Sequence, residues 1–105
     1  MVDNKKLLRL YEQAAKLKEV SSERENKYDL EVMTTSDQVT ATLIIKSDLS
    51  IQRKELVYIW LYERTGNLQA LLFDSVPMSA DDAIDMTILI IDALIIALKK
   101  GDVYE

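Results

Sequence analysis

Residues 79–100 carry hydrophobic side chains around most of the circumference of a predicted helix. At about 100° per residue, the charged positions collect on one line and leave the rest largely apolar. That line comprises Asp81, Asp85, Asp92 and Lys99, with Leu89 and Ile96 beside it. A helix on the surface of a domain needs only one apolar stripe of about 100°. The pattern therefore predicts a buried helix that a single sheet cannot cover, so that the N-terminal helix, a second subunit or both must pack on it.

Polar residues specify both ends of this helix. Ser79 is a good N-cap, and Asp82 stands where its carboxylate can reach back to the helix start. Lys99 and Lys100 suit the negative end of the helix dipole, and Gly101 suits the left-handed position that follows. Aspartates interrupt the apolar run, and an Asp at the centre of a bilayer costs about 2.5–3.5 kcal/mol. The sequence therefore predicts a buried helix and no membrane span.

The N-terminal segment predicts an amphipathic helix. It begins after Asp3 or Asn4 and ends near Glu19 or Val20. Its apolar stripe at helical spacing comprises Leu7, Leu10, Tyr11, Ala14 and Leu17, widened by Leu8 and Ala15. A helix that binds a membrane surface or a partner's groove is the alternative interpretation.

From Tyr28 onward the apolar period changes to two, which is typical of half-buried strands. Residues 28–33 and 39–45 predict one hairpin, with a turn at 35–37. Residues 55–63 and 68–73 predict a second hairpin, in which Gly66 supplies the positive φ of a tight turn. The polar residues 46–54 are interpreted as a loop or one helical turn.

The predicted strand at 56–62 is apolar on both faces. One face comprises Val57, Ile59 and Leu61, and the other comprises Leu56, Tyr58, Trp60 and Tyr62. One interpretation is a central strand whose aromatic side chains shield their neighbours. The other is an interface, because Tyr and Trp are enriched in binding hot spots.

Together these elements predict a single α+β domain over residues 1–105. We expect an N-terminal helix, a four-stranded antiparallel sheet and a C-terminal helix, with both helices on one face of the sheet. Sequential strand order is the first choice, although the connection at 46–54 also permits a rearranged order. The predicted core comprises Leu7, Tyr11, Ala14, Leu30, Val32, Leu43, Ile45, Val57, Ile59, Leu61, Ile84, Ile91, Leu94, Ile95 and Leu98.

Composition excludes several classes of chemistry. The chain has 105 residues and a net charge of −5, with no His and no Cys, so the usual acid–base, thiol and zinc-binding side chains are absent. Its two glycines cannot build a glycine-rich phosphate loop. Acidic residues near residue 80 could hold Mg²⁺ or Ca²⁺, namely Asp74, Asp81, Asp82 and Asp85. These carboxylates also complement the helix dipole, so we expect no metal there. From the composition we further expect no cofactor, no catalytic site and no binding of nucleic acid.

The excess of apolar surface predicts a homodimer that binds another protein in an adaptor, chaperone-like or regulatory role. A small-ligand-binding regulatory domain is the alternative, and a carboxylate-based enzyme is less favoured. The predicted interface residues are Leu56, Tyr58, Trp60, Tyr62, Leu89 and Ile96, with the aromatic face favoured for the dimer contact. The start of the chain lacks the apolar segment of a secretory signal, which favours the cytoplasm. In size, acidic balance and helix–sheet–helix plan the chain resembles dimeric secretion chaperones. No sequence motif carries this resemblance, so it assigns a role to no residue.

Overall fold

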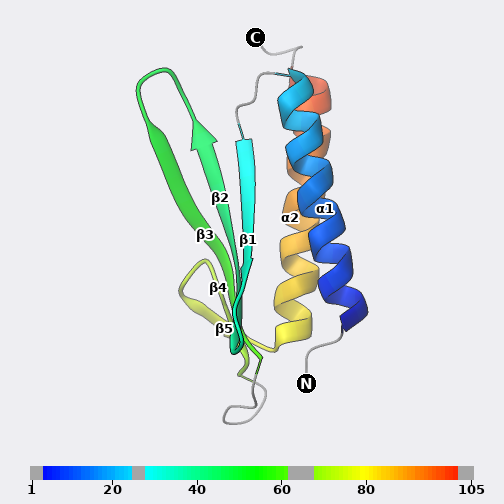
Figure 1. Ribbon diagram of the computed structural model, residues 1–105, viewed down its shortest axis with the longest axis vertical. Coiled ribbons are helices and arrows are strands. Elements are labelled where there is room, and N and C mark those ends of the chain that lie inside the picture. The colour runs from blue at the N-terminus through cyan, green and yellow to red at the C-terminus, as the bar shows by residue number, and fades with distance from the viewer. Residues whose placement is uncertain (1–3, 25–27, 62–67, 102–105) are drawn as a thin grey trace.

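The computed structural model describes residues 4–24, 28–61 and 68–101, and two helices pack on one face of an antiparallel sheet (Figure 1). In chain order the elements are α1 (Asn4–Arg24), β1 (Tyr28–Thr34), β2 (Gln38–Lys46), β3 (Ile51–Trp60), β4 (Ala70–Leu72), β5 (Val76–Met78) and α2 (Ala80–Gly101). The strands lie side by side in the order of the sequence. The predicted fold class and strand order are confirmed, with five strands rather than four.

The core lies between the helices and the covered face of the sheet. Leu10 and Leu17 of α1, Ile84 and Ile91 of α2, and Ile59 of β3 are all fully buried. In each helix the two residues are two turns apart, so they project from one face. Burying a Leu or Ile side chain contributes about 1.5–3 kcal/mol, and this layer therefore holds the helices on the sheet.

Most of the predicted core is buried or half-buried, but the prediction for Tyr11 is wrong. Tyr11 is 36% exposed, and its hydroxyl hydrogen-bonds to the hydroxyl of Thr34 at the end of β1. A tyrosine has an apolar ring and a polar tip that needs a partner. Helical spacing alone therefore does not decide whether such a residue lies in the core or at its rim.

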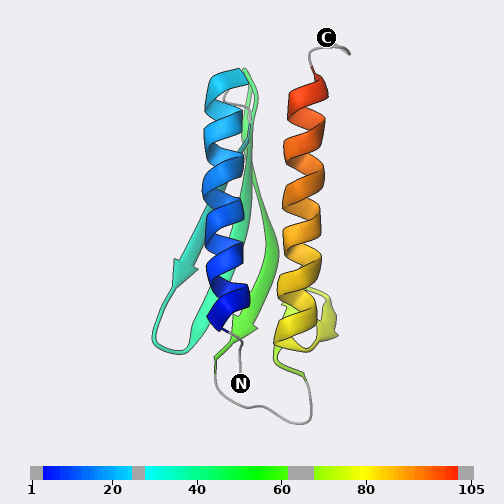
Figure 2. The same ribbon diagram turned by 90° about the vertical axis from the view of Figure 1, so that its right-hand side faces the viewer.

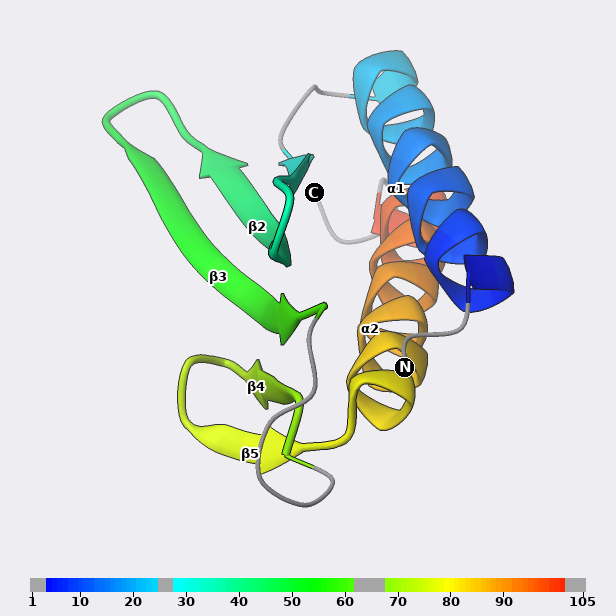
Figure 3. The same ribbon diagram turned by 60° about the horizontal axis from the view of Figure 1, so that its bottom comes forward.

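The β2–β3 hairpin is longer than predicted and extends away from the helices (Figure 1, Figure 3). The Ser47 N–H donates to the Ser50 carbonyl at 2.9 Å and closes the turn. The interpretation of residues 46–54 as a loop or helical turn holds for 47–50, which connect the two strands. It is wrong for the exposed residues 51–54, which form the first part of β3. A strand segment with solvent on both faces has no apolar alternation, and the sequence therefore carries no strand signal there.

A β-bulge in β3 changes the facing of Leu56. The pairing with β2 shifts between Ala41 and Thr42, so Leu56 is an extra residue in β3. It is 3% exposed and lies in the same core as its neighbour Val57. A bulge disrupts the alternation and bends the strand. For this reason the prediction that Leu56 shares a face with Tyr58 is wrong.

The fifth strand sets the direction of α2. A tight turn joins β4 to β5, with Phe73 at φ 53° and Asp74 at φ 61°, and the Ser75 N–H donates to the Leu72 carbonyl at 3.1 Å. Since the chain reverses at every strand, an odd number of strands delivers α2 parallel to α1 (Figure 1, Figure 2). A four-stranded meander would deliver it antiparallel. β5 was not predicted from the sequence because proline is rare within strands. Pro77 is tolerated here because β5 is an edge strand.

α2 begins where the sequence predicts. The Ser79 hydroxyl accepts the N–H of Asp82 at 3.2 Å, and the Ser79 carbonyl accepts the N–H of Ala83 at 3.0 Å. The first turn is acidic and the last turn is basic, an arrangement that stabilises the helix through its dipole. The helix runs through Gly101, one residue beyond its predicted end.

The two helices run parallel to each other (Figure 2). Polar side chains join them. Lys6 Nζ donates to Asp85 Oδ2 at 2.8 Å, and Gln13 Nε2 donates to Asp92 Oδ1. Both pairs are 79 residues apart in the sequence. The two aspartates on the charged line of α2 therefore face α1 and fix the register of the helix pair.

Candidate functional site

The face of the sheet away from the helices carries a row of side chains that crosses all five strands (Figure 1). One residue of each strand stands directly opposite the next, in the order Met33, Thr40, Tyr58, Leu71 and Pro77. Directly opposed residues share one face of a sheet. Met33 is 60% exposed. Nothing in the described part of the chain covers this row.

Trp60 extends the row along β3. Its ring packs edge-to-face on Tyr58, with centroids 5.0 Å apart and planes at 61°. The Tyr58 hydroxyl donates to Oε1 of Gln38, which stands opposite Trp60 in the register. Such ring pairs contribute about 0.5–1.5 kcal/mol beyond burial, so both half-buried rings are held in place before any partner arrives. The aromatic patch, as we name it, comprises Met33, Tyr58, Trp60, Leu71 and Pro77.

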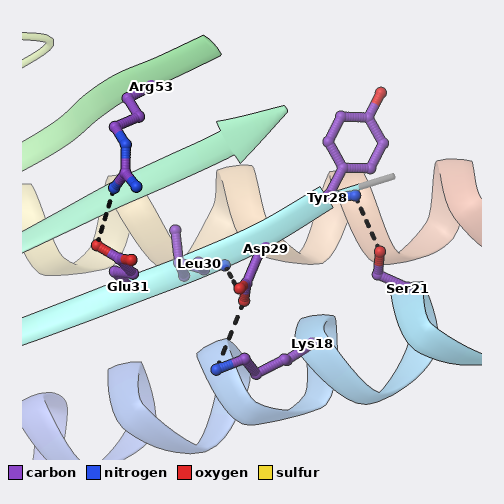
Figure 4. Close-up of polar contacts among 7 residues, drawn as sticks. All are labelled: Lys18, Ser21, Tyr28, Asp29, Leu30, Glu31 and Arg53. Atoms are coloured by element: carbon purple, nitrogen blue, oxygen red, sulfur yellow. Dashed lines mark hydrogen bonds and ion pairs between the residues drawn. The ribbon is translucent and has the colours of Figure 1, made fainter. Parts of the chain in front are cut away.

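An ion pair covers a different part of the sheet face away from the helices. Arg53 of β3 reaches across β2 to Glu31 of β1, with Nη1 3.3 Å from Oε2 (Figure 4). Ile44 of β2 pairs with Arg53 and is 5% exposed, although it lies outside the core cluster. An arginine buries its aliphatic stem along apolar surface while its charged end stays in water. The ion pair therefore covers Ile44, and the aromatic patch remains open.

Two carboxylates lie near the patch, one in β3 and one in the β4–β5 turn. Burial raises the pKa of the Glu55 carboxyl above its ordinary value of 4.5, and the negative charge of Asp74 raises this pKa further. Glu55 lies beside the bulge, and Asp74 lies in the β4–β5 turn. The folded protein therefore binds the Glu55 proton more tightly than the unfolded chain does.

Glu55→Gln is expected to raise the melting temperature at pH 7. A raised carboxyl pKa gives stability that is present at low pH and is lost as the pH rises through the folded value. The Gln side chain does not ionise, so the variant does not lose this stability at pH 7. Its higher melting temperature relative to the wild type should disappear near pH 3, where both proteins are neutral at this position. Thermal unfolding followed by circular dichroism at both pH values measures the difference. The exposed Glu12→Gln serves as the control, and a lower melting temperature for Glu55→Gln at pH 7 would contradict the expectation.

Side chains cap the outer edge of β1 (Figure 4). The hydroxyl of Ser21 in α1 accepts the N–H of Tyr28 at 2.9 Å, and the carboxylate of Asp29 accepts the N–H of Leu30 at 2.8 Å. Lys18 Nζ lies 3.6 Å from the same carboxylate. A partner strand needs free edge groups to pair with. The other edge strand, β5, has three residues and contains a proline, so a partner has to approach the face of the sheet.

The second predicted surface lies on α2, on the side away from the sheet. Leu89 is 62% exposed and Ile96 is 54% exposed, and Met86 beside them is 44% exposed. The structure therefore separates the predicted interface residues into two surfaces. Tyr58 and Trp60 lie on the open sheet face, whereas Leu89 and Ile96 lie on the outer helix surface.

The other two predicted interface residues are Leu56 and Tyr62, and of these only Leu56 is described by the structure. Leu56 lies in the core, and Tyr62 lies outside the described residues, as does the predicted turn at Gly66. The sequence missed the contributions of Leu71 and Pro77 to the aromatic patch. Only the pairing registers of the five strands bring the whole row together.

Among residues 4–24, 28–61 and 68–101, no three acidic side chains gather closely enough to hold a metal ion. In the same ranges, neither helix is long and apolar enough to cross a membrane.

Comparison with protein-family models, with curated proteins and with solved structures found no match to this chain. A fold alone does not determine a function. The function therefore has to be argued from the surfaces described above.

Proposed function

We propose that this chain is a non-catalytic, homodimeric protein that binds another protein through the aromatic patch, in an adaptor, chaperone-like or regulatory role. The observation that carries the proposal is the patch itself, a pre-packed Tyr58–Trp60 pair on the sheet face away from both helices. Tyr and Trp dominate binding hot spots because they bury a large area while losing little conformational freedom. Rings already locked by Gln38 and by each other lose still less.

The surroundings of the patch favour a particular kind of partner. Glu55 and Asp74 place negative charge beside it. Burial raises the pKa of Glu55, and the charge of Asp74 raises this pKa further. A partner segment with an apolar anchor for the rings and a neighbouring Lys or Arg for these carboxylates would complement both features. The capped edge of β1 supports docking on the face and not by strand addition.

Site-specific photo-crosslinking in the source cells tests the proposal. A photoreactive residue at Leu71, on the patch, should form a covalent adduct with a second, different polypeptide. The same residue at Leu8, which is 58% exposed on α1, should not. Trp60→Ala in the Leu71 variant should abolish the adduct, because it removes the ring that packs on Tyr58.

Three outcomes would contradict the proposal. They are equal adducts at both positions, an adduct that persists in the Trp60→Ala variant, or an adduct at Leu71 with a second copy of this chain alone. Trp60 is the single tryptophan of the chain. Its fluorescence therefore reports binding of the purified partner without a label.

A further inference from the structure

The outer surface of α2 carries an apolar stripe with opposite charges at its two ends. Its positions are separated alternately by four and three residues, which is the spacing of a seam between two helices. The α2 stripe comprises Asp82, Met86, Leu89, Ala93, Ile96 and Lys100, all of them exposed. Within the described part of the chain, neither Asp82 nor Lys100 has an ion-pair partner.

The α2 stripe is symmetrical about the level of residue 91. Positions 82 and 100, 86 and 96, and 89 and 93 are each equally far from that level. A two-fold axis there packs a second copy antiparallel on the first. Met86 then faces the partner's Ile96, and the large Leu89 faces the small Ala93 of the partner subunit, so the side chains can interdigitate.

Charge distinguishes the antiparallel arrangement from a parallel one. In the antiparallel pair, Asp82 meets the partner's Lys100 at both ends of the contact. A parallel pair would instead oppose like charges at each end, which is unfavourable. The first turn of α2 carries Asp81 and Asp82, and the last turn carries Lys99 and Lys100, so the charges of the helix are complementary to those of its own reverse.

We infer that a second copy of this chain docks antiparallel on the α2 stripe, closed at both ends by Asp82–Lys100 pairs. The inference rests on the homodimer of the proposed function and places the dimer contact on α2, whereas the sequence favoured the aromatic face for it. The patch then stays free for a different protein. The stripe is about 27 Å long at 1.5 Å per residue, a contact at the small end of the range for specific interfaces, so we expect dissociation in the micromolar range.

A charge swap tests the geometry. Asp82→Lys and Lys100→Asp should each weaken the dimer about tenfold, which corresponds to 1.4 kcal/mol, because each opposes like charges at both ends. The double variant should restore wild-type affinity, since it exchanges the partners without separating them. Mixing the two single variants should also produce a heterodimer in which every pair is complementary. Sedimentation velocity over a concentration series measures all four proteins.

An apolar substitution supplies an independent measurement. Leu89→Gln should abolish dimerisation at micromolar concentration, whereas Leu8→Gln, at a site of similar exposure on α1, should leave it unchanged. Circular dichroism verifies that each variant is folded. The double charge variant guards against a mere folding defect, because it carries both unfavourable end charges and is still expected to dimerise.

The outcomes separate this inference from the proposed function. A wild type that stays monomeric overturns both the α2 contact and the homodimer, while crosslinking at Leu71 still tests partner binding by itself. A wild-type dimer that tolerates Leu89→Gln overturns the α2 contact alone. A double charge variant weaker than either single variant overturns the antiparallel arrangement.

Discussion

Ile59→Ala is expected to destabilise the protein by about 2–5 kcal/mol, through lost burial and the cavity left behind. Ile59 is fully buried on β3, in the core that the sheet shares with both helices. Domains of this kind have unfolding free energies of about 5–15 kcal/mol, so the loss is a large fraction of the total. Urea unfolding followed by circular dichroism measures it.

Ile51→Ala is the matched control, because it makes the same change in the same strand. Ile51 is 65% exposed in the part of β3 that extends away from the helices. Its substitution should change the free energy of unfolding by less than about 0.5 kcal/mol. Equal losses in the two variants would contradict the path of β3 across the core.

Ser21→Ala is expected to cost about 1–3 kcal/mol, because it leaves a backbone donor without its partner. Ser21 is fully buried, and its hydroxyl accepts the Tyr28 N–H at 2.9 Å. Hydrogen exchange of the Tyr28 amide should accelerate more than that of amides in the middle of β2. Chemical denaturation gives the free energy, and amide exchange gives the location.

The adjacent serine provides the comparison for this prediction. Ser22 is exposed, and its hydroxyl donates to the Glu19 carbonyl at 2.8 Å. Ser22→Ala removes a bond that water can replace, so its cost should stay below about 0.5 kcal/mol. If Ser21→Ala proved as harmless as Ser22→Ala, the capping of the β1 edge would be wrong.

The sequence predicted those elements that have one face in the core and one in water. Both helices, the β1–β2 hairpin and the central part of β3 follow from apolar periodicity, as do the burial of Ile59 and Ile91. Apolar periodicity failed for segments that lack one buried face and one exposed face. Residues 51–54 have solvent on both sides, and β5 is a short edge strand with a proline. Missing β5 also hides the parallel direction of the two helices.

The candidate site was predictable only in part, for a reason of geometry. Tyr58 and Trp60 follow from the alternation of one strand, and the exposed Leu89 and Ile96 follow from the excess apolar circumference of α2. A bulge changes the facing of one residue without a sequence signal, so Leu56 moved into the core. A row across five strands depends on four pairwise registers at once, and periodicity within one segment does not contain them.

The pairing of α1 with α2 imposes an order on folding. Every ladder in the sheet joins strands that are neighbours in the sequence, whereas the Lys6–Asp85 and Gln13–Asp92 contacts close a loop of 79 residues. Closing a longer loop costs more entropy, and contacts distant in sequence slow folding. During synthesis, α1 and the sheet emerge before Ile84 and Ile91, which occupy the centre of the core. Until α2 docks, the nascent chain exposes the apolar inner face of its sheet, and transiently exposed apolar surface of this kind is prone to aggregation.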